Sequence, residues 1–118
     1  NGASGALTNG VTYQSINGGV FDFDGTDDYI SFPDDTNLNN QTLTMESWVK
    51  LDTTLYQQAF IFEKGNVNTQ YSNFQENNGY FYFRTMSLST QDLTLNLTNH
   101  VSAGDWFHIV CTYGHRQG

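Results

Sequence analysis

The 118-residue sequence has few positive charges: four Lys and Arg residues stand against twelve Asp and Glu, which gives a formal net charge of −8. Binding to nucleic-acid phosphates needs a basic surface, and so few cations cannot supply one. The same balance disfavours an anionic lipid surface, and no apolar run has the length of a membrane-spanning helix. We therefore expect neither a nucleic-acid partner nor membrane insertion.

Cysteine and proline each occur only once. Cys111 cannot form a disulfide within the chain, and its position in an apolar run indicates a small buried side chain. Aromatic residues, in contrast, make up 15% of the sequence, and eleven residues are Gly. Rings separated by turn-forming residues favour strands over helices, and a few rings can build a small core.

The segment Val20–Phe32, VFDFDGTDDYISF, predicts two short strands joined as a hairpin by a tight Asp-Gly turn. Because side chains alternate along a strand, Phe21 and Phe23 share one side, which we expect to face the interior. Gly25 gives the turn its backbone freedom, and Pro33 ends the second strand.

Other strands are predicted from alternating apolar and polar residues and from turn dipeptides. Besides the hairpin, they cover residues 11–15, 42–51, 59–64, 71–75, 80–85, 93–98 and 106–113. Short turns, no helical segment and no internal repeat predict an all-β, antiparallel sandwich or barrel.

Four segments resemble the laminin G-like, concanavalin A-like jelly-roll modules found in marine bacterial and phage surface proteins. They are FDFDGTDDYISFP (Phe21–Pro33), LTMESWVKL (Leu43–Leu51), IFEKG (Ile61–Gly65) and GDWFHIVCTY (Gly104–Tyr113). The lead-in GALTNGVTY (Gly5–Tyr13) is similar too. The resemblance implies one jelly-roll β-sandwich domain over residues 1–118, the central portion of a longer domain or chain. It also implies an extracellular or virion-surface location.

A candidate ligand surface follows from alternation on two strands. If the apolar residues of 43–51 and of 80–85 face the core, the residues between them face outward. These candidate ligand-binding residues are Glu46, Trp48, Lys50, Tyr80, Tyr82 and Arg84. Flat rings with a few polar groups suit a small polar ligand, and the resemblance implies a glycan or cell-surface polysaccharide. The alternative is that these rings pack against another layer or against other protein chains.

A second candidate is a group of acids at positions 22, 24, 27, 28, 34 and 35. Calcium binds six to eight oxygen ligands, and clustered carboxylates supply them. Asp24, Asp27 and Asp28 are the candidate ligands, although the sequence lacks the EF-hand pattern. The alternative is that these carboxylates accept backbone N–H groups within the turn.

Catalysis is not expected. A retaining glycosidase needs two carboxylates about 5–5.5 Å apart. Glu46 and Glu63 each lack a second acid on the same strand face. The three histidines, His100, His108 and His115, are scattered without zinc-ligand spacing, and a structural hydrogen bond is expected for His108.

The sequence thus predicts a non-catalytic recognition or attachment module, carbohydrate-binding, within a larger extracellular or virion protein. One alternative is a structural jelly roll of a virion that assembles with neighbouring chains. A second is an ancillary domain of a glycoside hydrolase.

Overall fold

The computed structural model describes residues 4–34, 42–52, 59–65, 71–75, 79–85 and 93–114; at positions 42, 43, 71–75, 85, 113 and 114 it describes the backbone alone. The chain divides into two compact units, Asn1–Leu38 and Asn39–Gly118. The described elements are strands apart from one short 3-10 turn, which confirms the all-β class. The single domain expected over all 118 residues stays a prediction.

The first unit holds four three-residue strands that form two antiparallel pairs. β1 (Ala6–Thr8) pairs with β4 (Tyr29–Ser31). β2 (Thr12–Gln14) pairs with β3 (Val20–Asp22), and the 3-10 turn η1 (Ile16–Gly18) connects them. The strand expected near residues 11–15 is confirmed by β2.

The hairpin predicted between β3 and β4 is wrong in its pairing, because each strand pairs with a strand earlier in the chain. The reason lies in the connection, which spans six residues instead of a two-residue turn. Gly25 does adopt a positive φ of 76° there. Phe21 and Phe23, expected to face the interior, are half exposed, and Val11 is the buried apolar residue among the described part of this unit.

The second unit contains a four-stranded antiparallel sheet in the order β6-β7-β8-β9. These strands are β6 (Ala59–Lys64), β7 (Tyr71–Gln75), β8 (Tyr80–Thr85) and β9 (Leu93–Asn96). β7 and β8 pair antiparallel, and Gly79 directly before β8 has a positive φ of 77°. A register shift between Phe60 and Phe62 interrupts the β6–β7 ladder.

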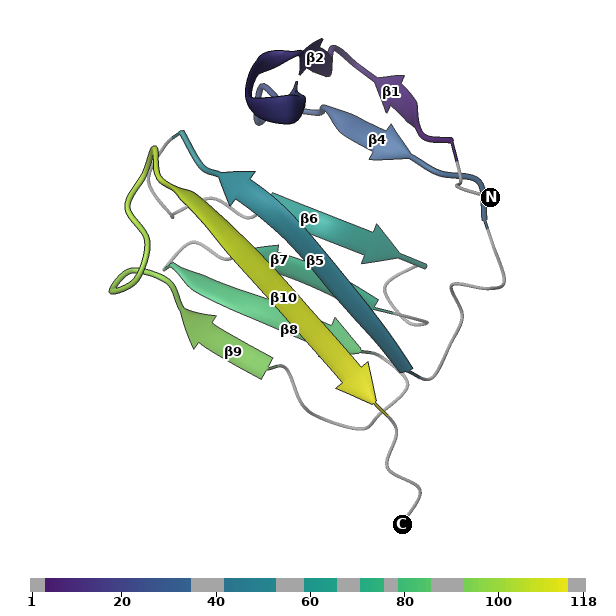
Figure 1. The fold of residues 1–118 in the computed structure, drawn as a ribbon. Coiled ribbons are helices and arrows are strands. Elements are labelled where there is room, and N and C mark those ends of the chain that lie inside the picture. Colours follow the sequence, from purple (N-terminus) through teal and green to yellow (C-terminus); the bar gives the residue numbers. More distant parts are fainter. Residues whose placement is uncertain are drawn as a thin grey trace. The chain divides into compact units, whose positions relative to one another are not determined.

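A second layer crosses this sheet, formed by the antiparallel pair β5 (Thr42–Lys50) and β10 (Trp106–Gly114) (Figure 1). The core lies between the layers. It is built from Phe81 and Phe83 on β8, Ile109 on β10 and Leu97 after β9, all buried, and further apolar side chains pack against it. Burial of each such side chain stabilises the fold by about 1.5–3 kcal/mol.

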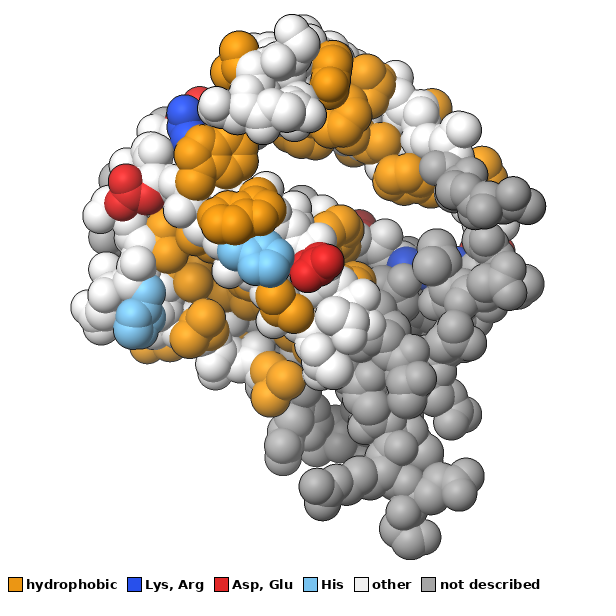
Figure 2. Space-filling model, in the orientation of Figure 1, with side chains coloured by type: hydrophobic (Ala, Val, Ile, Leu, Met, Phe, Trp, Pro, Cys, Tyr) orange, Lys and Arg blue, Asp and Glu red, His pale blue; other side chains and the backbone are white. Residues whose placement is uncertain are grey.

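The alternation predicted for β5 and β10 is confirmed. Met45 and Val49 pack against the core, as do Phe107 and Cys111. The residues between them face the other way and are exposed. Figure 2 shows hydrophobic side chains at the surface here, beside a histidine and an acidic side chain.

One part of the inner side of the four-stranded sheet stays open to solvent. Leu93 and Leu95 lie directly opposite Phe83 and Phe81, so they share the inward side of the sheet. They are nevertheless 62% and 48% exposed, because the two-stranded layer is narrower than the four-stranded sheet. Among the described residues, no helix has the length and apolar character needed to cross a membrane.

Burial also controls the chemistry of the single cysteine. Desolvation raises the pKa of the Cys111 thiol, so a smaller fraction is ionised at a given pH. Because the thiolate is the nucleophile, we expect iodoacetamide at pH 8 to alkylate the folded protein at least about tenfold more slowly than the urea-unfolded chain. Mass spectrometry of timed samples measures both rates. Equal rates would contradict the burial of this thiol.

Candidate functional site

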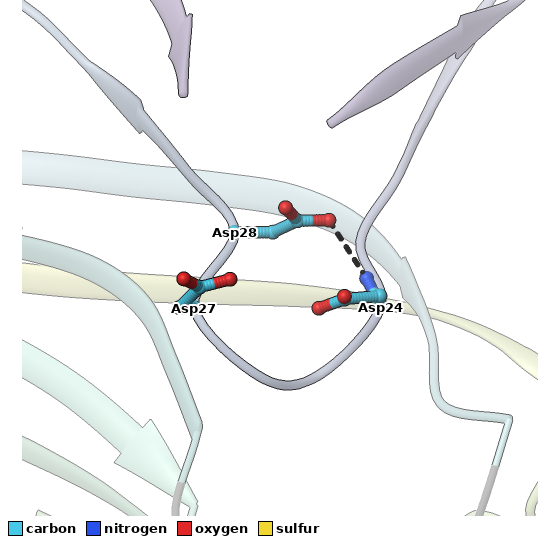
Figure 3. Close-up of side chains that lie close together, drawn as sticks. All are labelled: Asp24, Asp27 and Asp28. Atoms are coloured by element: carbon cyan, nitrogen blue, oxygen red, sulfur yellow. Dashed lines mark hydrogen bonds between the residues drawn. The ribbon is translucent and has the colours of Figure 1, made fainter. Parts of the chain in front are cut away.

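The aspartate turn, defined as Asp24, Asp27 and Asp28, lies in the connection between β3 and β4 (Figure 3). Each residue offers a carboxylate oxygen, and the three oxygens lie within 4.8 Å of one another. Two carboxylates also bind the backbone. The N–H of Thr26 donates to Asp24 Oδ1 at 2.8 Å, and the N–H of Asp24 donates to Asp28 Oδ2 at 2.9 Å.

These hydrogen bonds agree with the turn interpretation of the acids. One observation supports the cation interpretation: Asp28 Oδ1 is buried and has no hydrogen-bond partner. Calcium needs six to eight oxygens, and the turn brings together three carboxylates, two of which are already engaged. The residues therefore fit calcium in part, and calcium stays a prediction. Asp22 and Asp34 lie outside this cluster, and Asp35 lies outside the described residues.

The more extensive candidate is the exposed side of the second layer, here called the β5–β10 face. The antiparallel register places its residues in four opposed pairs. They are Lys50 with Trp106, Trp48 with His108, Glu46 with Val110, and Thr44 with Thr112. Side chains in such pairs are close neighbours, and diagonal pairs remain within reach of large rings. The face therefore joins two tryptophans, a histidine and a carboxylate.

The turn before β10 sets this register. Gly104 has a φ of 86°, a conformation that favours glycine. Its N–H donates to the carbonyl oxygen of Leu51 at 2.7 Å, which holds the start of β10 beside the end of β5. Trp106 consequently lies opposite Lys50.

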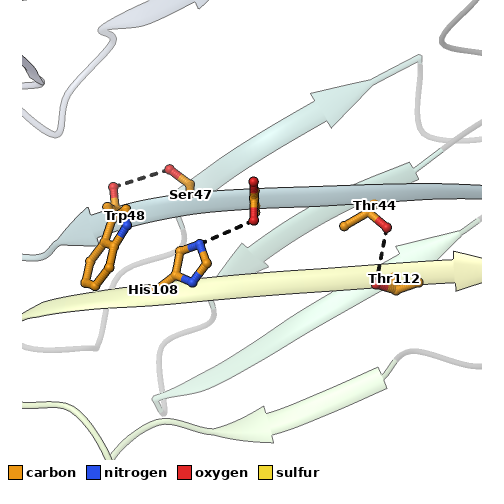
Figure 4. Close-up of polar contacts among 6 residues, drawn as sticks. Thr44, Ser47, Trp48, His108 and Thr112 are labelled. Atoms are coloured by element: carbon orange, nitrogen blue, oxygen red, sulfur yellow. Dashed lines mark hydrogen bonds and ion pairs between the residues drawn. The ribbon is translucent and has the colours of Figure 1, made fainter.

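Trp48 and His108 form the centre of the face (Figure 4). Their ring centroids are 5.0 Å apart with an interplanar angle of 24°, so the imidazole stacks on the indole. Nε2 of His108 lies 3.6 Å from Oε2 of Glu46 on the neighbouring strand. The imidazole therefore contacts the indole and lies close to the carboxylate.

Polar groups extend the face at both ends. Nζ of Lys50 lies 3.4 Å from Oδ1 of Asp52. At the other end, the hydroxyl oxygens of Thr44 and Thr112 are 3.3 Å apart, within hydrogen-bond distance. The rings between them remain accessible, with Trp48 66% and Trp106 46% exposed.

The six predicted ligand-binding residues do not come together. Glu46, Trp48 and Lys50 lie on the β5–β10 face, as the alternation indicated. The others belong to β8, whose alternate residues Phe81 and Phe83 are buried between the layers. The remaining three, Tyr80, Tyr82 and Arg84, thus lie on the outer side of the four-stranded sheet, here called the β8 face.

The β8 face is the less exposed of the two. Tyr80 and Tyr82 are partly buried, and their ring centroids are 6.4 Å apart at an interplanar angle of 47°. Arg84 is partly buried as well. The two faces lie on opposite sides of the core, so one small ligand cannot contact both.

Three residues of the β5–β10 face were not among the predicted ligands: Trp106, His108 and Val110. The imidazole of His108 stacks on an exposed ring, and the structural hydrogen bond expected for it stays a prediction. The alternation in WFHIVCTY could have identified all three, because it places them on the side of the strand that points away from Phe107, Ile109 and the core. What the sequence lacked was the pairing of β10 with β5.

The comparisons with known proteins agree with the fold. A laminin G family model, described as concanavalin A-like lectin/glucanases superfamily, matches residues 24–118. A search of the curated proteins and a search of the solved structures each found no match.

Proposed function

Because the chain belongs to the laminin G family of the concanavalin A-like lectin/glucanases superfamily, we propose that it is a non-catalytic carbohydrate-binding module. The β5–β10 face is its glycan-binding surface. The observation that carries this proposal is the exposed Trp48, oriented by the stacked ring of His108 and flanked by a carboxylate.

The chemistry of the face suits a sugar. A pyranose ring has an apolar side that stacks on an indole and hydroxyl groups that hydrogen-bond to polar side chains. Trp48 and Trp106 supply exposed rings, and Glu46 supplies a carboxylate that accepts hydrogen bonds from hydroxyl groups. Because Trp48 is already stacked on His108, ordering its ring on binding costs less conformational entropy.

The small number of carboxylates on this face favours a binding role over hydrolysis. Among the described residues of β5 and β10, Glu46 is the one carboxylate, and it lies beside the imidazole of His108. A glycosidase needs two carboxylates across the scissile bond. We propose further that the module serves attachment in a larger extracellular or virion-surface protein, a role that its net charge of −8 supports.

The test uses the chain's own fluorescence. The sequence has two tryptophans, Trp48 and Trp106, and both lie on the β5–β10 face. Titration with oligosaccharides from a panel of polysaccharides is expected to shift the emission to shorter wavelength in a saturable manner, because a stacked sugar removes water from the indoles.

A Trp106→Phe variant assigns the signal to Trp48 and should retain the shift. Retention on a polysaccharide gel without any change in emission would place the glycan elsewhere on the chain. If no polysaccharide is retained and the emission never changes, the proposal fails.

A second candidate function, assembly with other protein chains, is favoured by Leu93 and Leu95. These inward-side leucines are exposed at the β9 edge of the four-stranded sheet, and an exposed apolar edge is a template for another strand. A protein that binds no polysaccharide and sediments as an oligomer would favour this second function.

A further inference from the structure

We infer that the glycan held by the β5–β10 face is an uncharged, hydroxyl-rich chain, not a sulfated or uronate polysaccharide. This inference rests on the proposed function and names the substrate class of the same site. It follows from the charges on and around the face.

Cations that could neutralise a polyanion are scarce here. Lys50 is the one Lys or Arg among the described residues of this face, and its ammonium already lies 3.4 Å from the carboxylate of Asp52. Lys64 belongs to β6 and Arg84 to β8, both on the other sheet. Recognition of sulfate or carboxylate groups relies on Arg and Lys donors, which this face does not gather.

The histidine does not supply the missing charge. When His108 is protonated, its nearest charged group is the Glu46 carboxylate at 3.6 Å, which offsets the positive charge. When His108 is neutral, Glu46 leaves the centre of the face negative. In either state an approaching sulfate or uronate meets a carboxylate beside Trp48, within a chain whose net charge is −8.

An uncharged glycan meets no such opposition. The side chain of Glu46 is 67% exposed, so its oxygens can accept hydrogen bonds from sugar hydroxyls. The Thr44 and Thr112 hydroxyls both donate and accept. The face therefore combines exposed rings with groups that suit hydroxyls.

The experiment compares electrophoretic retardation of the whole chain in native gels. The gels contain an uncharged glucan, an uncharged mannan, a sulfated galactan or a polyuronate. We expect retardation in at least one uncharged gel and none in the two anionic gels. Solution binding of the retained uncharged glycan should change less than about twofold between 0.05 and 0.5 M salt, because no ion pairs form and screening has little to act on.

A variant that removes the charge of Glu46 is expected to change the affinity for uncharged glycans and the affinity for anionic glycans in opposite directions. Glu46→Gln should weaken binding of the uncharged glycan about threefold to tenfold, since a charge-assisted hydrogen bond is lost. The same variant would strengthen binding of a polyanion, because a repelling charge is removed. Glu63→Gln is the matched control, because it removes the same charge from an exposed position on β6, outside this face, and it should leave affinity for the uncharged glycan within about twofold.

Three outcomes can be told apart. Trp48-dependent, salt-sensitive binding of the sulfated or uronate glycan would overturn this inference and leave the proposed function standing. Absence of binding to all four polysaccharides would overturn the proposed function and this inference with it. Salt-insensitive retention by an uncharged glycan that weakens in Glu46→Gln would support both.

Discussion

Replacing Trp48 with alanine is expected to weaken glycan binding at least about tenfold, which corresponds to about 1.4 kcal/mol. The indole is the most exposed large apolar side chain among the described residues, and it stacks on His108 at the centre of the β5–β10 face. Alanine removes the ring on which the sugar stacks and also frees the imidazole. Affinity electrophoresis against a retained polysaccharide, repeated by titration calorimetry, measures the loss.

The fold should survive this change. Trp48 is 66% exposed, so its removal forfeits little buried area, and the lost stack with His108 is worth about 0.5–1.5 kcal/mol. Far-UV circular dichroism should therefore match that of the unmodified protein. Tyr82→Ala removes a ring from the β8 face and is the matched control, with expected binding within about twofold. If Tyr82→Ala weakened binding as much as Trp48→Ala did, the assignment of the glycan to the β5–β10 face would be wrong.

Replacing Phe83 with alanine is expected to destabilise the protein by about 3–5 kcal/mol, the usual cost of removing a buried aromatic ring. Phe83 is 3% exposed and belongs to the core between the two layers. A domain of this size has a total stability of about 5–15 kcal/mol, so the loss is a large fraction of it. Urea denaturation followed by circular dichroism measures the change.

Phe60→Ala provides the matched control, since the same ring is removed from a position that is 50% exposed. Its cost should be about half as large or less, because less area leaves contact with the protein. If Phe83→Ala does not fold, Phe83→Leu tests the same point with an expected loss of about 1–2 kcal/mol. Equal denaturation midpoints for the variants at positions 83 and 60 would contradict the packing of the core.

The predictions were more accurate for the second unit than for the first, and the lengths of the strands explain this difference. β5 and β10 have nine residues each, and alternation over that length specifies which side of the strand is apolar. The strands of the first unit have three residues each, too few for a pattern to specify a partner. Val20–Phe32 contained two strands and a glycine turn as predicted, yet its strands pair with β2 and β1 instead of with each other.

The same distinction applies to the candidate sites. The acids of the aspartate turn are close in sequence, and hydrogen bonds over two and four residues bring them together, so local reasoning identified them. The site on β5 needed a partner from far along the chain. From the sequence, Trp48 and Tyr82 were assigned to one ligand surface because both face outward, and His108 was not included in it.

The sequence by itself determined the all-β class, the strands of the second unit, the inward and outward residues of β5, β8 and β10, and the family. These follow from the two-residue period of side chains along a strand and from local motifs, and both are visible in the sequence. Only the tertiary structure decided which outward sides belong together. It separated Trp48 from Tyr82 by placing a core between their sheets, and it joined Trp48 to His108 and Glu46, because the register between strands distant in sequence depends on how the layers pack.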